Sequence, residues 1–479
     1  MALSGANMIS SPPGVMNRTL PRAANIFKKS PLLLALAIGL WALRPLAPHA
    51  FAHPQALTPM GEESHNQLGL RYLREGNLEA AGGEFRAAVA EHPDDAKALS
   101  NLAVVLGRQG REKEAEHDFQ EAIQNNPGFE GAHLNLALLL ARQGRLVEAR
   151  TEAEKAAAIA PRDSRAFTVL GSVQARLDKL EDAVASFRKA ADLDPLSADT
   201  HLNLGIALAE LSESQRVDLT RALAEFTQAV HLAPNSAAPH YHRGRALFDL
   251  NRYSEAEPEL EAALKLQPND PASLYILGLT EGQLGRTERS NQLLTRVTAL
   301  NPQNAKAHYF LGQNLIHQGD TAGAIAQWRE AIKLDPEDGP TLYNLSLALR
   351  KTDPSGAHEY SLRYLQLQNR HRITKLAESA QLAAEAAAQK GDWQGAVNQL
   401  KQAVSVCGDC SIRLDLHRTL GLAYCYADQL AEGERELREV LKQRPNDLDA
   451  QRAIEIINLL KKQASNAESP KPGPLPASQ

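Results

Sequence analysis

Three cysteines are the residues of this chain best suited to redox or metal chemistry. Cys407 and Cys410 form a C-x-x-C pair, and the third cysteine is Cys425. Such a pair can form a disulfide, exchange with other thiols or supply two zinc ligands. A zinc site would need two more ligands, for which His417 and Cys425 are candidates, and nothing nearby predicts the βαβ pattern of a thioredoxin-like domain. In an exported protein we expect a local Cys407–Cys410 disulfide and a free, buried Cys425.

Motifs for other catalytic chemistry are missing from the sequence. It contains no G-x-S-x-G nucleophile motif, no phosphate-binding glycine loop and no H-E-x-x-H zinc motif. Carboxylates are plentiful, but they occupy solvent-facing helix positions with ordinary i, i+4 partners. The sequence therefore predicts no catalytic residue, no cofactor and no bound metal.

The elements that would position these side chains repeat at a fixed period. Eight prolines are spaced 34 residues apart, with one interval of 39: Pro93, Pro127, Pro161, Pro195, Pro234, Pro268, Pro302 and Pro336. Seven of the eight repeats carry a Leu-Gly or Leu-Ala pair, such as Leu68-Gly69, which is typically followed by a small residue (Ala81) and a large apolar one (Phe85). Apolar residues three and four apart predict two amphipathic helices per repeat. We expect a polar turn such as Gln109-Gly110-Arg111 to end the first helix and proline to end the second.

This pattern resembles the tetratricopeptide repeat family over nearly all of residues 62–447. One helix pair leaves its apolar face uncovered, so the repeats must stack. The resemblance implies an all-α fold, a right-handed superhelical solenoid of antiparallel helix pairs. It also implies a protein that binds other proteins and has no catalytic machinery of its own.

Irregularities in the pattern divide the chain into segments. We expect a signal peptide or N-terminal anchor at 1–52, a linker at 53–61, eight regular repeats at 62–338, a degenerate ninth repeat and connecting helix at 339–376, two further repeats at 377–447, a capping helix at 448–464 and a disordered Pro/Ser tail at 465–479. A five-residue insertion within 211–219 should lengthen the turn of the fifth repeat.

The family usually binds extended peptides along the inner face lined by the first helices, and two sets of residues there are candidate contacts. The first set consists of asparagines that directly precede the marker leucine of their repeat, Asn101, Asn135, Asn203 and Asn344. The second set consists of tyrosines two residues before the marker position, Tyr241, Tyr275, Tyr309 and Tyr343. The amides could bond a peptide backbone, and the tyrosines offer apolar area with a polar tip. Alternatively, the amides satisfy neighbouring backbone groups and the tyrosines pack between repeats.

A third set of candidates is basic. Arg74, Arg108, Arg142 and Arg176 recur five residues beyond the pair in the first four repeats. Positive charge near a helix C-terminus contributes about 0.3–1 kcal/mol, which is one explanation for this row. The other is that it receives an acidic peptide or a terminal carboxylate. The family's carboxylate clamp needs a lysine two residues before the marker leucine, and this chain has none there, so that clamp is absent.

Six histidines share one register, three residues before the marker position, where the family often has a large aromatic side chain. They are His65, His133, His201, His240, His308 and His417. Because they mostly lie in alternate repeats, we do not expect them to chelate a metal.

The N-terminal segment and the net charge indicate where the protein acts. Basic residues precede an apolar run at 31–43, which is shorter than the roughly 20 residues that span a bilayer and is followed by Ala50-Phe51-Ala52, typical of a signal-peptidase site. We expect cleavage before His53 and export, either to the periplasm or out of the cell. Residues 1–52 carry five basic and no acidic residues, so their removal changes the net charge from −5 to −10 and disfavours nucleic-acid binding. The alternative is an uncleaved anchor in the inner membrane at 31–43.

The sequence therefore predicts an exported scaffold or adaptor that holds a protein or peptide partner in its concave groove. It predicts no nucleic-acid partner and no membrane span after signal cleavage. One alternative function is a membrane-tethered assembly factor for cell-envelope machinery. An alternative of another class is a redox or zinc module that uses Cys407 and Cys410.

Overall fold

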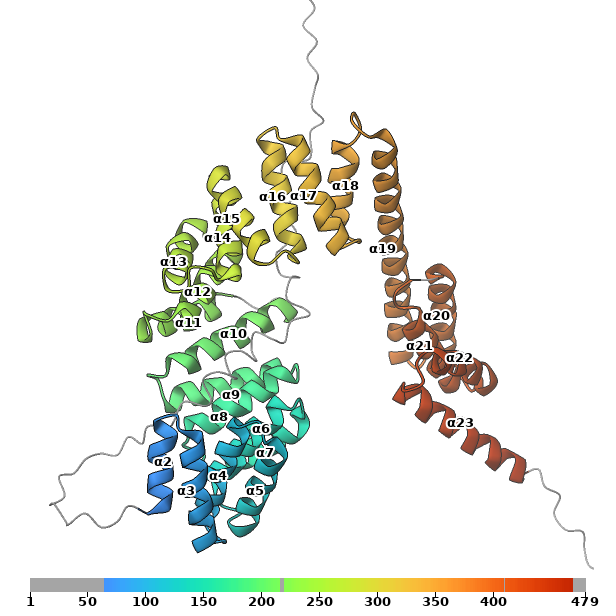
Figure 1. Ribbon diagram of the computed structural model, residues 1–479. Coiled ribbons are helices and arrows are strands. Elements are labelled where there is room, and N and C mark those ends of the chain that lie inside the picture. Colours follow the sequence, from blue (N-terminus) through green and yellow to red (C-terminus); the bar gives the residue numbers. More distant parts are fainter. Residues whose placement is uncertain (1–63, 216–218, 409, 468–479) are drawn as a thin grey trace, which may run out of the picture. The chain divides into compact units, whose positions relative to one another are not determined.

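A computed structural model describes residues 64–467 of the chain, except 216–218 and 409. All the regular elements of these residues are α-helices, 22 in number (Figure 1), which confirms the predicted all-α solenoid of helix pairs. They form two bodies that divide after Pro302. The expected signal peptide or anchor, the linker at 53–61 and the tail beyond residue 467 lie outside the described residues.

Seven helix pairs make up the described part of the first body. Their bounds are α2 His65–Arg74, α3 Leu78–Glu91, α4 Ala96–Arg108, α5 Glu112–Asn125, α6 Glu130–Arg142, α7 Leu146–Ile159, α8 Ser164–Arg176, α9 Leu180–Leu193, α10 Ala198–Gln215, α11 Thr220–Leu232, α12 Ala237–Asp249, α13 Tyr253–Leu266, α14 Pro271–Gln283 and α15 Thr287–Leu300.

The helices of the first body stack in chain order. The two helices of each pair pack against each other, and the second helix packs on the first helix of the next repeat. The first helices of successive repeats also touch one another, from α2 through α14. These seven first helices, α2, α4, α6, α8, α10, α12 and α14, therefore share one side of the stack, which we call the inner face.

Close approach of the paired helices depends on the small residue of the Leu-Gly or Leu-Ala pair. A Cβ atom added to Gly69 would lie 2.6 Å from the ring of Phe85, and one added to Gly205 would lie 2.5 Å from the ring of Phe226. Both rings are fully buried. As the sequence pattern predicts, the large side chain of the second helix occupies the space that a larger residue on the first helix would need.

A residue in the left-handed backbone region ends most first helices. Gly110 and Gly144 take φ of 80° and 78°, as expected of glycine in a polar turn. Asp178, which has the equivalent position one repeat later, takes φ of 60°. Asp tolerates this conformation better than most residues that carry a Cβ, so the turn persists without glycine.

The fifth repeat differs from the expectation of a longer turn. Its first helix, α10, has 18 residues, whereas α8 has 13. Residues 211–215 of the insertion continue the helix, because they contain neither Gly nor Pro to end it. The insertion therefore extends α10 by more than one turn.

The second body continues the helix pairs and then departs from them. Its helices are α16 Ala305–His317, α17 Thr321–Leu334, α18 Gly339–Ala348, α19 Pro354–Gln389, α20 Trp393–Cys407, α21 Arg413–Tyr426, α22 Leu430–Gln443 and α23 Leu448–Ala467.

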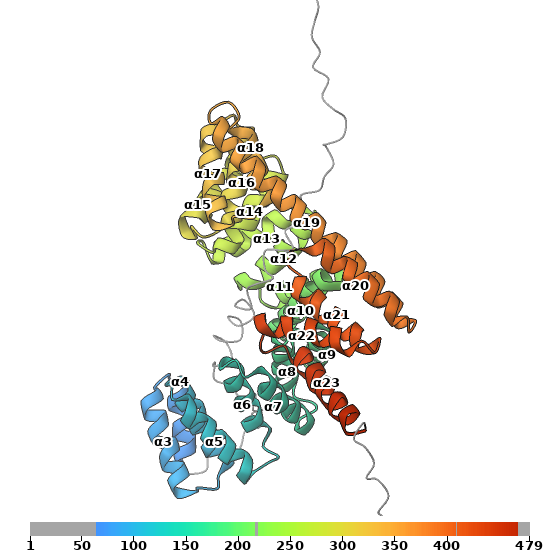
Figure 2. The same ribbon diagram turned by 90° about the vertical axis from the view of Figure 1, so that its right-hand side faces the viewer.

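The 36-residue helix α19 joins two repeats (Figure 2). Ala357 and Leu367 pack in the core of the ninth repeat, and Ala377 and Ala384 pack with α20. The sequence led us to expect a connecting helix that ends at 376 and a new first helix from 377. Instead one helix crosses this boundary, because the chain contains neither Gly nor Pro between Gly356 and Gly391.

Candidate partner-binding site

The asparagines that precede the marker leucines lie on the first helices and are half-buried. The side-chain amide of Asn101 donates to Oδ1 of Asn66 on α2 at 2.9 Å, so it is partly satisfied within the chain. The amides of Asn135 on α6 and Asn203 on α10 form no hydrogen bond with any described residue. Asn344 on α18 belongs to the second body and is also half-buried. Asn135 and Asn203 therefore keep both donor and acceptor capacity on the inner face.

The arginine row (Arg74, Arg108, Arg142 and Arg176) follows one edge of the inner face, because each arginine is the last residue of its first helix. Nη1 of Arg176 donates to the carbonyl oxygen of Ala141, at the end of α6, over 2.6 Å. Nη2 of Arg142 similarly lies 3.3 Å from the place where a Cβ of Gly107, at the end of α4, would be. These arginines thus reach back to the C-terminal end of the previous first helix, where positive charge is favourable.

The same row also presents positive charge that the chain only partly compensates. Burial lowers the pKa of Arg108 and of Arg176, since a half-buried guanidinium is partly desolvated. Arg74 and Arg142 are exposed, and neither makes an ion pair with a described residue. An anionic group placed along this edge would meet several cations.

The four tyrosines of the predicted stripe differ in their environments. Tyr241 and Tyr275 are only 8% and 5% exposed, and burial raises the pKa of both hydroxyls. They pack inside the first body, so the expectation that this register faces the groove does not hold for them. Tyr309 is half-buried and Tyr343 is 47% exposed, and both belong to the second body. Only these two offer ring surface to a partner.

The six histidines bind side chains of their own repeat. In five of them Nδ1 lies 2.7–2.8 Å from a glutamate oxygen of the second helix, and His308 contacts Gln327 at 2.8 Å. In three, the other ring nitrogen faces the carbonyl oxygen of the proline before the first helix, as for His133 and Pro127 at 3.1 Å. These contacts tie both helices and the preceding turn together. We did not predict these contacts from the sequence, although the spacing of 19 residues from His133 to Glu152 recurs in it.

A buried ionic cluster lies at the end of α14. Glu281 has a fully buried side chain and pairs with Arg286 at 3.2 Å and with Arg289 at 3.0 Å. Its carboxylate lies close to those of Glu257 and Glu261. Both arginines also pair with Glu257, and Arg289 pairs with Glu261, so the cluster is an ion-pair network that joins α13 and α14 to α15.

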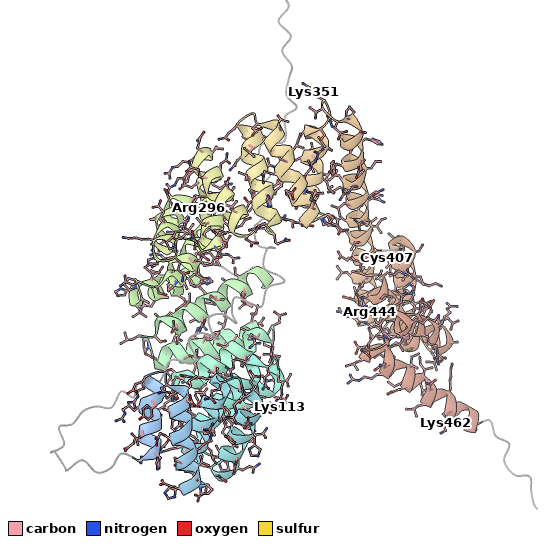
Figure 3. The ribbon with its side chains drawn as sticks, viewed as in Figure 1. Lys113, Arg296, Lys351, Cys407, Arg444 and Lys462 are labelled. Atoms are coloured by element: carbon pink, nitrogen blue, oxygen red, sulfur yellow. A yellow bond between two sulfur atoms is a disulfide. The ribbon has the colours of Figure 1, made fainter. Side chains whose placement is uncertain are left out.

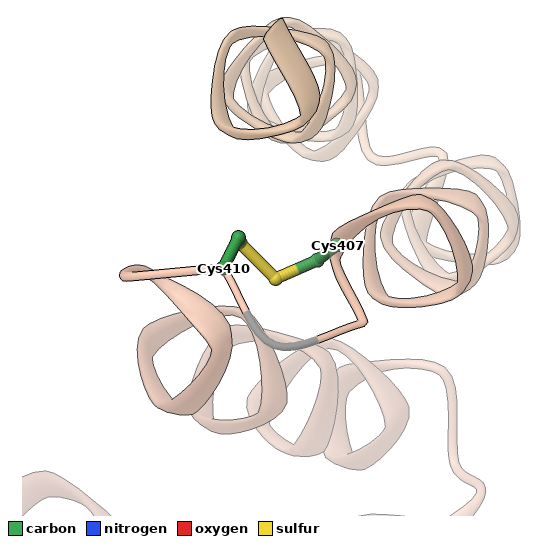
Figure 4. The surroundings of a disulfide bond; sticks show 2 residues. All are labelled: Cys407 and Cys410. Carbon is green, nitrogen blue, oxygen red and sulfur yellow. A yellow bond between two sulfur atoms is a disulfide. The ribbon is translucent and has the colours of Figure 1, made fainter. Parts of the chain in front are cut away.

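The cysteines occupy the junction of α20 and α21. Cys407 and Cys410 form a disulfide with Cα atoms 5.0 Å apart, and both are buried (Figure 4). Cys425 is free and half-buried rather than fully buried, and burial raises the pKa of its thiol. A disulfide leaves neither Cys407 nor Cys410 as a thiolate that could bind zinc.

Among the described residues, no helix is both long enough and apolar enough to span a membrane. The apolar run at 31–43 lies outside the described residues.

Comparison with known protein families shows which family the repeat pattern matches. Two models described as tetratricopeptide repeat match the chain, one at residues 66–129, 168–237 and 275–339 and the other at 106–173 and 215–277. Together they span 66–339, which is more than half of the chain. No curated protein sequence matches it.

Several solved structures are similar over part or most of the chain. YrrB, described as a tetratricopeptide repeat protein with an unusual peptide-binding site, is 22% identical, with 40% of this chain and 95% of that chain covered and a TM-score of 0.35. PilF of Pseudomonas aeruginosa is 21% identical, with 46% and 98% covered and a TM-score of 0.38. Yeast Tom70 is 15% identical, with 85% and 96% covered and a TM-score of 0.35.

Proposed function

The chain belongs to the tetratricopeptide repeat family, and from this membership we propose that it is an exported, non-catalytic scaffold that binds an extended acidic segment of a protein partner. The segment lies along the inner face of the first body. Asn135 and Asn203 bind its backbone, and the arginine row binds its carboxylates.

The observation that carries this proposal is the state of Asn135 and Asn203. Both amides are half-buried on the inner face and neither bonds to a described residue, so both are open to a ligand. An amide offers one acceptor and two donors, which match the N–H and C=O groups of an extended peptide. Because the first helices are stacked, these hydrogen-bonding amides recur along the inner face, and such a row suits the binding of an extended chain.

The charge of the segment follows from the arginine row. Arg108 and Arg176 are already partly desolvated, so they lose less water when they bind a carboxylate. Arg74 and Arg142 are exposed and have no ion pair with a described residue that would compete. A charge-assisted hydrogen bond contributes about 1.5–3 kcal/mol. With four arginines on one edge, two such bonds would be enough to favour an acidic segment over a neutral one.

The second body has a contact area of its own for apolar side chains of a protein partner. Tyr343 and Leu347 on α18 are 47% and 37% exposed, and the ring of Tyr343 lies 5.4 Å from that of Tyr364. An aromatic ring that is already held by a neighbour loses little freedom on binding.

A pull-down with the tagged full chain from an extract of the cell envelope tests the proposal. The substitution pair Arg74→Glu with Arg142→Glu should abolish recovery of the partner. The matched control is Arg86→Glu with Arg188→Glu, which makes the same change of charge at exposed positions on the second helices α3 and α9. The control should recover the partner as the unaltered chain does. Equal recovery by both pairs would contradict the proposed surface.

Export forms part of the proposal and has its own test. N-terminal sequencing of the mature protein should begin at His53. A chain that retains residues 31–43 would instead favour the membrane-tethered assembly factor.

A further inference from the structure

Helix α23 buries one apolar face and exposes large apolar side chains beside charged ones on the opposite face. Ala450, Ala453 and Ile457 are buried against the core formed by Leu437 and Val440 of α22. With about 100° of rotation per residue, Leu448, Arg452, Glu455 and Leu459 lie on the opposite side of the helix. We call these four residues the outer seam.

The outer seam has the spacing of a helix-pairing surface. Its residues are separated by four, three and four positions, as are the core positions of a coiled coil. Leu448 and Leu459 are 62% and 60% exposed, and Ile456 beside the seam is 57% exposed. Figure 3 shows Lys462 close to the C-terminal end of α23, one turn beyond the seam. Ile456 and Leu459 are three residues apart, so their exposed side chains adjoin, and an exposed apolar patch on a helix indicates an interaction surface.

The charges of Arg452 and Glu455 determine in which orientation a second α23 can pair with the outer seam. Arg452 and Glu455 are exposed, and neither makes an ion pair with a described residue. If a second α23 lies antiparallel, so that Leu448 faces Leu459 of the other copy, then Arg452 faces Glu455 of the other copy, and the same holds in reverse. A parallel pair would instead oppose Arg452 to Arg452 and Glu455 to Glu455, which is unfavourable.

We propose that two copies of this chain associate through the outer seams of antiparallel α23 helices. The contact is isologous, because the same four residues serve on both sides and close the pair by two-fold symmetry. It goes beyond the proposed scaffold function, since it joins two inner faces in one particle and so allows bivalent binding.

The printed sequence that follows α23 offers no equal occupant. Beyond α23 the sequence has twelve residues with a single large apolar side chain, Leu475, and prolines at every second position from Pro470 to Pro476. Such a segment cannot supply two leucines with a cation and an anion between them at helical spacing. One helix pair is smaller than a standard protein interface, so we expect reversible association in the micromolar range.

The test is sedimentation equilibrium of the purified full chain from about 1 to 100 µM, a range set by that expected affinity. Arg452→Glu and Glu455→Arg should each weaken the dimer about tenfold, because each replaces two attractive contacts by two repulsive ones. The double substitution should restore the dimer, since it exchanges the two charges. Leu459→Asp should give a monomer. Leu196→Asp, at another exposed leucine in the turn before α10, is the matched control and should leave the dimer unchanged.

Three results would overturn the proposal. The first is a monomer at all concentrations. The second is a double substitution that is no tighter than the single ones, which would exclude the antiparallel register. The third comes from hydrogen exchange of a monomer. If α23 is protected only in a chain that retains residues 1–63, that segment covers the seam in place of a second copy. Circular dichroism of every variant checks that the helices stay folded.

Discussion

Replacing Gly205 by alanine should destabilise the first body by about 1 kcal/mol. The new Cβ would lie 2.5 Å from Cε1 of Phe226, whereas ordinary contacts are 3.4–4 Å, so the ring or α10 must move by about 1 Å. Phe226 has little room to move, because it is 1% exposed and stacks on His242 at 5.4 Å. Overpacking of this kind costs about 2 kcal/mol, and the higher helix propensity of alanine offsets about 1 kcal/mol.

Gly83 supplies the matched control within the same body. It lies in the middle of α3 with nothing within 4 Å of an added Cβ, so alanine there should stabilise the protein by up to about 1 kcal/mol. The two variants should therefore differ by about 2 kcal/mol in the free energy of unfolding by urea, followed by circular dichroism. Hydrogen exchange should localise the loss to α10 and α11, because repeats unfold in part independently. If Gly205→Ala proves as stable as Gly83→Ala, the close approach of paired helices does not depend on the missing Cβ.

Other perturbations have equally definite outcomes. Phe187→Ala should cost about 4 kcal/mol in urea unfolding, because the ring is fully buried; a cost below about 1 kcal/mol would contradict its place in the core. Replacing Cys407 and Cys410 by serine should cost about 2 kcal/mol, the loop-closure value for so short a loop, and the variant should unfold alike with and without reductant. The hydrogen bond to Glu84 raises the pKa of His65, so its stabilisation is complete below about pH 6.5 and is lost as the pH rises through the higher folded value; NMR titration should show a midpoint above 6.5 that Glu84→Gln lowers.

The helix pairs were predictable because their signals are local. Proline and glycine end helices wherever they occur, and the small residue at Gly69 facing the large one at Phe85 repeats at one spacing. The same logic failed where such signals are missing. The run without Gly or Pro from 357 to 390 makes one helix of what we expected to be two, and residues 211–215 extend α10.

The sequence predicted which repeat positions are equivalent, but not which of them are exposed to a partner. Tyr275 and Tyr343 occupy equivalent positions, yet one is 5% and the other 47% exposed. Their exposure depends on packing against other elements, which no local pattern encodes. Asn101 and Asn135 differ for a similar reason, because Asn66 is present to accept from Asn101 and no described residue serves Asn135.

Site-specific photo-crosslinking in living cells tests the central claim, that a protein partner lies along the inner face. A photoreactive residue at Leu138 or Ile206, each one helical turn beyond Asn135 or Asn203 on the same helix face, should crosslink one and the same partner. The same photoreactive residue at Val147 or Leu196 should give no such product. These two positions lie outside the inner face and are 63% and 78% exposed. A partner captured from Val147 or Leu196 but not from Leu138 or Ile206 would contradict the account.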